Sequence, residues 1–451
     1  MEQSLPKKVI NLTAVNDFGF TLFINMEIYY FSAFLTDVAG FSLKMLALIL
    51  TVTEIINVAQ VPITGWIIEK ANFKWGKYRS WFAICPPIMV VFYGLMFSRV
   101  SANEAIAAFV IILAYTIKTQ AQNLPYSASV ALVSDLSNDQ NERLVLSTRR
   151  AQWLSMGNIV FSAIIAAVIA FFGNVSGSAL WGYTLTAVAL GFFNWICNYV
   201  TFKTIKGCKS VSGSDQKEIA EKKLPTKEMF KAVFKNPPLL IVLLADTFKY
   251  LSYFLISSAA YYYFIVVIGN YAAMAIYLVI TRFAGIVGSS LSNFVGQRFG
   301  KKQTYIAANV LCALSLLICW WFRSLVVFIV AHVIYNIFLQ ISFATLTALL
   351  ADTVIYYKHK TDIDARGFIM TMLCVPIKIG SLIKGIVLSA GLAAAQYVAN
   401  SAPTDVTVSG VAKLMSIYPA AFILFGTAIF LFFYHLNEKE VDRLTAELEA
   451  R

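Results

Sequence analysis

The residues of this chain that could do chemistry are ionisable side chains inside, or at the end of, long apolar segments. The clearest cases are Glu27, Glu54, Lys118, Arg150 and Lys378. Because charge is costly in a hydrocarbon environment, such residues usually serve an ion, a proton or a polar solute. A buried carboxyl group holds its proton more tightly than an exposed one, so Glu54 and Glu27 are candidate proton carriers. The alternative for each is a structural ion pair with a buried Lys or Arg, or a position at the edge against lipid.

Uncharged polar residues recur at helical spacing in the same segments. Positions three and four residues apart lie on one face of a helix, so each run forms a polar stripe. Stripes of this kind line a wet cavity between helices, and the alternative is interhelical hydrogen bonding, which contributes only ~0.6 kcal/mol per contact. The clearest stripes are Asp17, Thr21, Asn25, Tyr29, Ser32 and Thr36, then Thr53, Asn57, Gln60 and Thr64, and later Asp246, Lys249, Tyr250, Tyr253 and Ser257.

Catalytic and metal-binding patterns are not found in the sequence. The three histidines, His332, His359 and His435, stand in separate segments. No HExxH pattern and no phosphate-binding loop occur, and the six cysteines include no CxxC pair. Neither a metal site nor a disulfide framework is therefore indicated. We expect no enzyme activity and no cofactor.

The composition indicates the medium in which these residues are positioned. Hydrophobic residues make up 59% of the 451 and charged residues 13%, with a mean hydropathy of +0.70. A single soluble core cannot hide that much apolar surface, so we expect an all-α integral membrane protein. Crossing ~30 Å of hydrocarbon takes about 20 apolar residues. Twelve such segments stand near 15–38, 41–69, 81–98, 104–133, 151–173, 179–202, 238–267, 271–296, 304–322, 325–355, 368–397 and 411–435.

The distribution of lysine and arginine predicts the orientation. With the N-terminus inside, nearly all loop Lys and Arg fall on the cytoplasmic side, and the other side keeps Lys44, Arg99, Arg323 and Lys413. The positive-inside rule thus places both termini in the cytoplasm. It also accounts for the net charge of +12 without a nucleic-acid partner. The short polar N-terminus lacks the cleavage site of a signal peptide, so we expect the first helix to be retained.

A Gly-Lys turn recurs at matching places in the two halves of the chain. One copy, at 65–81, closes the second apolar segment, and a weaker copy, at 288–304, closes the eighth. An offset of six segments indicates an internal repeat. We expect a six-helix bundle at 1–202, a polar, lysine-rich cytoplasmic linker at 203–237, a second six-helix bundle at 238–437 and a cytoplasmic tail at 438–451.

Short motifs, in the order of the chain, carry a resemblance to a known family. They are Asp37-Val38-Ala39-Gly40, Trp75-Gly76-Lys77-Tyr78-Arg79, Leu124-Pro125-Tyr126 and Ala351-Asp352-Thr353-Val354. Over nearly its whole length the chain resembles the glycoside–pentoside–hexuronide:cation symporters. The resemblance implies the major facilitator fold, with two six-helix bundles that rock about a central site. It also implies uptake of a sugar or glycoside across a bacterial inner membrane, with the lipid bilayer as its surroundings.

Charged residues at the cytoplasmic ends of the segments repeat across the halves. Pairing between such charges can lock a closed gate, and the alternative is simple snorkelling or helix capping. The family usually has an acid before the glycine at Arg366-Gly367, so the pairing is expected to differ here. The candidate gating residues are Lys77, Arg79, Asp135, Arg143, Asp352 and Arg366.

The resemblance also implies a substrate site, with four departures from the family pattern. Melibiose-type members bear cation-binding aspartates at the positions of Asn57 and Val61 here. They bear sugar-gripping aspartates at the positions of Thr21 and Asn123. Since a sodium ion needs several oxygen ligands and a negative charge, we expect no sodium site of that type. Any coupling would then use a proton, carried by Glu54 or Glu27.

Basic and aromatic positions of the family pattern are retained. Arg150 and Lys378 keep their charge, and an aromatic ring that stacks on the sugar falls at or near Phe343. Fewer acids beside two basic groups favour an anionic substrate, such as a hexuronide or a sulfonated sugar. The expected substrate-binding residues are Thr21, Asn25, Asn57, Asn123, Tyr126, Arg150, Phe343 and Lys378.

Other interpretations of the sequence stay open. A neutral glycoside fits equally well if Asp17, Glu27, Glu54 or Asp246 neutralises Lys378. A lipid-like or other amphiphilic solute is a further possibility, because the chain holds 35 phenylalanines. Uncoupled facilitated transport also remains an alternative, as does a sensor without transport.

Overall fold

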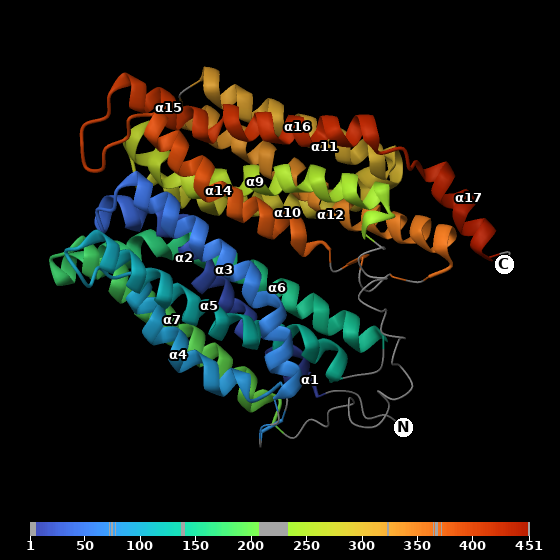
Figure 1. The fold of residues 1–451 in the computed structure, drawn as a ribbon, viewed down its shortest axis with the longest axis horizontal. Helices are drawn as coiled ribbons and strands as arrows, with labels where there is room; N and C mark the ends of the chain where they lie inside the picture. The colour runs from blue at the N-terminus through green and yellow to red at the C-terminus, as the bar shows by residue number, and fades with distance from the viewer. Residues whose placement is uncertain are drawn as a thin grey trace. The chain divides into compact units, whose positions relative to one another are not determined.

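The computed structural model describes residues 6–71, 73, 75, 76, 78–136, 140–206, 233–322, 324–363, 365, 369, 370 and 372–449. Within these ranges the regular secondary structure is entirely helical (Figure 1). The chain divides into two compact units, Met1–Glu221 and Lys222–Arg451. In the first unit the helices are α1 (Lys7–Leu12), α2 (Val15–Ala33), the π-helical η1 (Phe34–Val38), α3 (Leu43–Lys70), α4 (Trp81–Met96), α5 (Glu104–Asp135), α6 (Gln140–Ser176) and α7 (Ala179–Thr204).

The second unit is also built from helices, and its last one folds back onto the others. Helix α17 packs against the end of α12 (Figure 1). Val441 and Leu444 of α17 are only 6% and 4% exposed, so the chain end expected as a tail contributes to the core of this unit. The helices are α9 (Pro237–Val266), α10 (Ala273–Phe299), α11 (Lys301–Trp321), α12 (Leu325–Thr361), α14 (Cys374–Ala394), α15 (Asp405–Met415), α16 (Ile417–Phe433) and α17 (Glu438–Glu449).

Side chains at the helix starts explain several of these boundaries. The Asn103 side chain accepts hydrogen bonds from the backbone N–H groups of Ala105 and Ile106, which would otherwise lack partners at the start of α5. Asn236 does the same for Leu239 at 3.3 Å, and Pro237 follows it at the first position of α9, where no N–H is needed. These caps begin two of the long helices that carry site residues.

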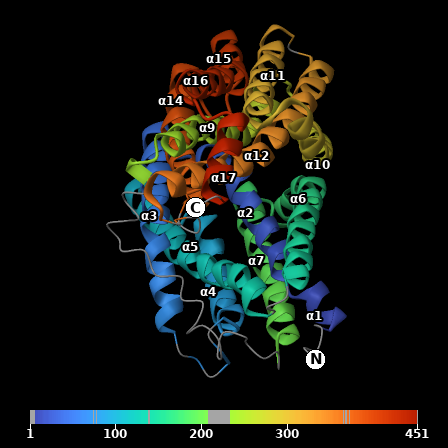
Figure 2. The ribbon, with the colours of Figure 1, turned by 90° about the vertical axis from the view of Figure 1, so that its right-hand side faces the viewer.

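Small residues let helices approach closely within each unit. In the first unit α2 packs against both α6 and α7 (Figure 2). A Cβ added at Gly157 of α6 would stand 2.8 Å from Thr21 Cβ. In the second unit a Cβ at Gly426 of α16 would stand 2.6 Å from the carbonyl oxygen of Ala245. Such contacts are typical of helices packed in lipid, where close van der Waals approach replaces the hydrophobic drive of water.

The prediction of an all-helical membrane protein is confirmed. Among the described residues, eleven helices are long and apolar enough to span a membrane, and Trp81–Met96 is a shorter apolar helix. The last predicted segment differs, because α15 and α16 are separated at Ser416. Pro419 in the first turn of α16 explains the break, since it offers no N–H and its ring would clash with a helix continuing from before it.

One helix is much longer than the sequence predicted. Helix α6 has 37 residues and begins at Gln140, whereas the apolar pattern indicated a start near 151. At ~1.5 Å per residue it measures about 55 Å, well beyond the ~30 Å of hydrocarbon. The first turns of α6 are polar and can remain helical outside the lipid, because only the part of a helix inside the hydrocarbon must be apolar. The structure therefore extends α6 beyond Arg150 on the N-terminal side.

Candidate functional site

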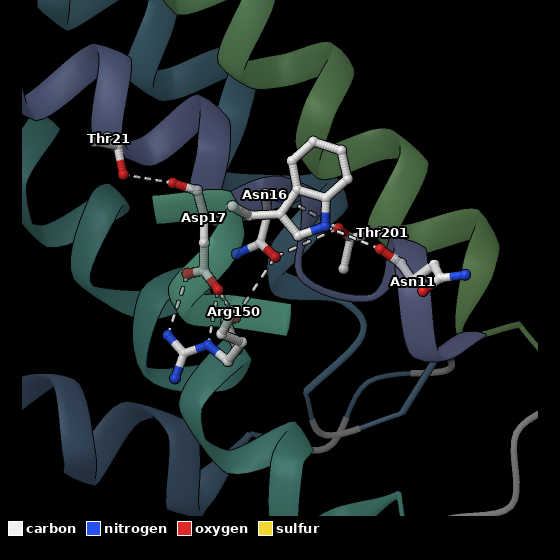
Figure 3. Close-up of polar contacts among 8 residues, drawn as sticks. Asn11, Asn16, Asp17, Thr21, Arg150 and Thr201 are labelled. Carbon is white, nitrogen blue, oxygen red and sulfur yellow. Dashed lines mark hydrogen bonds and ion pairs between the residues drawn. The ribbon is translucent and has the colours of Figure 1, made fainter. Parts of the chain in front are cut away.

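A buried ion pair joins α2 to α6 in the first unit (Figure 3). The Arg150 Nε donates to Asp17 Oδ2 at 2.7 Å, and Nη2 donates to Oδ1 at 3.1 Å. The Asp17 side chain is fully buried, and that of Arg150 is 16% exposed. Ser129 of α5 donates to Asp17 Oδ2 at 3.2 Å. Arg150 was expected to hold the acid group of a substrate, and in this structure two of its donors bond to Asp17.

Neighbouring polar residues fix α2 in place around this pair. The backbone N–H of Asn16 donates to Thr201 Oγ1 at 3.2 Å, which ties α2 to α7. Trp153 Nε1 donates to the carbonyl oxygen of Asn11 at 2.9 Å, which ties α6 to α1 (Figure 3). The Thr21 hydroxyl donates to the carbonyl oxygen of Asp17 at 2.7 Å. The Thr21 hydroxyl thus donates within its own helix, as hydroxyl residues in membrane helices often do.

Glu27 and Lys118 form a second buried ion pair in the first unit. Lys118 Nζ donates to Glu27 Oε2 and, at 3.2 Å, to Gln122 Oε1. The Lys118 side chain is 1% exposed and that of Glu27 is 16% exposed. The ammonium also stands 4.7 Å from the centre of the Tyr115 ring. This arrangement matches the structural ion pair that the sequence left open for Glu27.

Glu54 lies on α3 and contacts a neutral side chain of the same helix. Asn57 Nδ2 donates to Glu54 Oε2 at 3.2 Å, so one carboxylate oxygen faces a neutral amide. Glu54 is 8% exposed, whereas Val61 is 51% exposed. Asn57 therefore donates to the candidate proton carrier, and Val61 is an exposed apolar residue of the same helix.

Three other predicted binding residues of the first unit lie in different settings. Asn25 donates to Asn158 Oδ1 of α6 at 2.9 Å. Tyr126 is 37% exposed and stacks on Phe20, with ring centroids 4.6 Å apart. Asn123 differs from both, because its buried Nδ2 has no hydrogen-bond partner among the described residues. It is an amide donor that a hydroxyl or acid oxygen could satisfy.

The second unit gathers aromatic rings around Phe343 of α12. The Tyr250 and Tyr253 rings of α9 stand 4.9 and 6.1 Å from it, centroid to centroid. Lys249 Nζ lies 4.6 Å from the Phe343 ring centre. Lys378, on α14, is half-buried. Phe343, the aromatic residue expected to stack on a sugar, therefore has the buried ammonium of Lys249 beside its ring.

Lys249 and Asp246 are residues whose importance the sequence reasoning missed. They form a fully buried ion pair on α9. The signal in the sequence is their spacing of three residues inside an apolar segment, which by itself indicates only a polar stripe. The spacing shows that two side chains of one helix can meet, but it does not show that neighbouring helices bury them.

The candidate gating residues are described only in part. Arg79 Nε donates to the carbonyl oxygen of Phe202 at 2.9 Å, and its guanidinium stands 4.0 Å from that ring. Asp352 accepts from Lys301 Nζ at 2.7 Å. Lys77 and Arg366 lie outside the described residues. Asp135 ends α5 and Arg143 lies in the first turn of α6, and their side chains lie outside the described part.

The first turn of α11 is held by the C-terminal helix. Glu438 Oε1 accepts from the backbone N–H of Lys301 at 2.7 Å, a favourable place for negative charge. Gly300 has φ +83°, and a Cβ there would stand 2.9 Å from Glu438 Oε2. Glu438, which lies outside the repeat, thus fixes the second copy of the Gly-Lys turn.

Across the described residues, no group of three or more His, Cys, Asp or Glu could hold a metal ion.

Comparison with known proteins gives matches along the whole chain. The family model described as MFS/sugar transport protein matches residues 12–438. The isoprimeverose transporter of Lactiplantibacillus pentosus is 24% identical over 445 residues, covering 97% of this chain and 90% of that protein. The glucuronide carrier protein homolog of Escherichia coli (strain K12) is 21% identical, covering 100% and 97%. A putative sulfoquinovose importer of the same strain is 24% identical, covering 97% and 92%.

Solved structures match in fold. A mutant form of the nucleoside transporter NupG aligns with a TM-score of 0.66 at 15% identity, covering 94% of this chain and 100% of that chain. A bacterial homolog of the human lysosomal transporter Spinster, inward-facing and unoccupied, aligns with a TM-score of 0.67 at 14% identity, covering 98% and 97%. At this identity the likeness describes the architecture alone.

Proposed function

Since this chain belongs to the MFS/sugar transport protein family, and is a multi-pass membrane transporter rather than an enzyme, we propose that it carries an acidic sugar or glycoside together with a proton. The transport would proceed by alternating access, the movement that major facilitator proteins share. The proposed location is a bacterial inner membrane with both chain termini in the cytoplasm, as the lysine and arginine distribution favours.

The observation that carries the acidic substrate is the set of neutral side chains at positions where melibiose-type members have carboxylates. Asn123 is the most informative, because its amide is a buried donor with no partner in the described part of the chain. An amide donor can serve a sugar hydroxyl or an acid oxygen, and it does not repel an anion as a carboxylate would. Among the relatives, the names of the glucuronide carrier homolog and the sulfoquinovose importer mention acidic sugars.

Each proposed binding residue has a separate role. Lys378 is proposed to hold the acid group, Asn57 and Asn123 to contact hydroxyls, and Phe343 or Tyr126 to stack on the ring. Arg150 is left out of the acid-binding role, since it is already paired with the Asp17 carboxylate through two hydrogen bonds. A guanidinium that is already paired adds little attraction for a second anion.

A neutral glycoside is the second candidate, and one observation favours it. The Asp17–Arg150 pair leaves no net charge at that place in the first unit. The name of the isoprimeverose transporter also mentions a sugar without an acid group. The two candidates differ in charge, so a matched pair of substrates separates them.

Coupling is proposed to use a proton and not sodium. Asn57 and Val61 supply no carboxylate at the sodium positions of melibiose-type members, and a partly dehydrated sodium ion needs such charge. Glu54 is the proposed carrier in the first unit. Its Oε2 accepts from the neutral Asn57 amide, whereas Glu27 forms an ion pair with Lys118 that joins α2 to α5, so a structural role accounts for Glu27.

Uptake by purified protein in liposomes tests the proposal. A glucuronide and the glucoside with the same aglycone would be offered with and without an inward proton gradient. Accumulation of the glucuronide that requires the gradient supports the acidic, proton-coupled function. Preference for the glucoside would move the assignment to the neutral candidate, and uptake of neither would contradict both.

A further inference from the structure

The ion pair on α9 in the second unit has an unusual set of partners. The Asp246 and Lys249 side chains are 0% and 1% exposed. Lys249 Nζ donates to Asp246 Oδ1, which also accepts from the Tyr305 hydroxyl of α11 at 3.4 Å. Asp246 Oδ2 is buried and has no hydrogen-bond partner among the residues the structure describes. Buried carboxylate oxygens nearly always have partners, so this oxygen needs an explanation.

The attraction between the two charges does little by itself to fix the packing of the helices. The pair contacts other helices through single hydrogen bonds, with Tyr305 of α11 and Ser342 of α12. Both members stand on the same helix, three residues apart, so their attraction ties no second helix to α9. Taking two charges out of water is nevertheless costly, and replacing such a pair by apolar residues often leaves stability unchanged or higher. A structural role is therefore a weak reason for its presence. A carboxylate with one uncompensated buried oxygen is, by contrast, well suited to accept a proton.

Lys249 connects this carboxylate to the aromatic group around Phe343. Its Nζ donates to Ser342 Oγ at 3.1 Å, and Ser342 Oγ donates to Asn309 Oδ1 of α11 at 2.8 Å. The same Nζ stands 4.6 Å from the Phe343 ring centre and 4.8 Å from that of Tyr305. Ser342 and the two rings are partners of the ammonium other than Asp246.

We infer that Asp246 is a proton-binding site, with the proton taken from water onto Oδ2, and that its protonation unmasks the charge of Lys249 beside Phe343. Before protonation the pair has no net charge, and afterwards it carries one positive charge. An acid group near the Phe343 ring then binds more favourably, so proton and anion favour each other's binding. This link to the anion rests on the proposed acidic substrate, whereas proton binding itself does not.

Few other titratable groups act on this pair. On the described parts of the helices packed around it, Tyr305 and Cys312 of α11 and Tyr250 of α9 interact with the pair, and Tyr253 of α9 and Cys374 of α14 interact in turn with Tyr250. Lys384 of α14 lies over the Phe254 ring, 6.0 Å from its centre. None of these groups is a second carboxylate. A carboxyl signal that disappears on replacing Asp246 would therefore belong to that residue.

Infrared difference spectroscopy of the purified protein, without any sugar, tests proton binding directly. As the pH is lowered, the carbonyl stretching band of a protonated carboxyl group should appear in the wild type and be missing in Asp246→Asn. Asp405→Asn, which removes an exposed acid at the start of α15, is the matched control and should keep the band. A band that is unchanged in Asp246→Asn, or that never titrates in the wild type, would overturn the inference.

A second variant keeps the inference testable if Asp246→Asn does not fold. Lys249→Met removes the cation that favours the charged carboxylate, so the band should appear at a higher pH than in the wild type. A band at the same or a lower pH would contradict the assignment.

The link to the substrate is measured by glucuronide binding as a function of pH. We expect wild-type affinity to rise about tenfold as Asp246 takes up its proton, within the usual range of coupling between two sites. In Asp246→Asn, which mimics the protonated state, affinity should be high and independent of this titration. If the band titrates but no glucuronide binds, the proton site stands and the proposed substrate is wrong. If glucuronide is transported but the band is absent, the proposed function stands and the proton site is wrong.

Discussion

The Arg150 guanidinium donates two nearly parallel hydrogen bonds to the Asp17 carboxylate, at 2.7 and 3.1 Å. The two residues stand 133 positions apart in the chain and join α2 to α6. Bidentate pairing of this kind is among the strongest contacts an arginine makes. It ties α2 to α6 in the first unit and places a carboxylate beside this cation.

Breaking this pair on one side should destabilise the protein strongly. Asp17→Asn leaves a largely buried guanidinium without its counter-ion, at a cost of about 3 kcal/mol or more. We expect thermal unfolding of the detergent-purified variant several degrees below that of the wild type. The double variant Asp17→Leu/Arg150→Met removes both charges and should recover much of the loss. Equal stability of Asp17→Asn and wild type would show that the pair contributes little.

Uptake should not depend on sodium. Asn57 and Val61 provide no carboxylate for the ion, and Val61 is 51% exposed on its unit. Initial rates in vesicles would be compared in sodium and in choline medium at fixed pH. The expected ratio is near one. Stimulation by sodium above about tenfold, equivalent to ~1.4 kcal/mol of coupling, would show that a sodium site exists.

Glu54→Gln should abolish accumulation driven by a pH gradient while leaving counterflow exchange intact. Glutamine keeps the shape and the contact with Asn57 but cannot carry a proton. Glu27→Gln is the comparison variant. It leaves the buried Lys118 ammonium without its counter-ion and should therefore lower the unfolding temperature. Wild-type accumulation by Glu54→Gln would remove Glu54 from the coupling role.

Lys378→Ala should reduce preference for an acidic sugar. Competition of a glucuronide and the matching glucoside for the binding site gives this preference directly. We expect it to fall by about tenfold, which corresponds to ~1.4 kcal/mol. Lys384→Ala removes the other lysine of α14 and should leave the preference unchanged. An unaltered preference in Lys378→Ala would place the acid group elsewhere.

Gly300→Ala should destabilise the second unit. Its φ of +83° belongs to a region that other residues rarely adopt, and the new Cβ would meet the Glu438 carboxylate at 2.9 Å. We expect a loss of about 1–3 kcal/mol in unfolding free energy. Gly296→Ala is a matched control, since a Cβ there meets nothing within 4 Å. Equal unfolding temperatures for the two variants would contradict the proposed clash.

The sequence by itself determined the class of this protein and the places of its helices. Hydropathy over about 20 residues is a local property, so the apolar segments could be read one at a time and correspond to the helices observed. The motifs from Asp37 to Val354 likewise sufficed for the family. Where the sequence erred, at the start of α6 and the break at Ser416, polar helical turns and a proline shifted the boundaries of helices whose apolar cores were correctly placed.

Only the tertiary structure decided which charges are paired. Arg150, which was expected to contact a substrate, forms an ion pair with Asp17. Lys118 meets Glu27 across 91 residues of sequence. Lys249 meets Asp246 on one helix, but their burial depends on α11 and α12. A stripe of polar residues defines a helix face, whereas the partner of each residue depends on how neighbouring helices are rotated and how closely they pack. That arrangement is a property of the packed unit, and no single segment contains it.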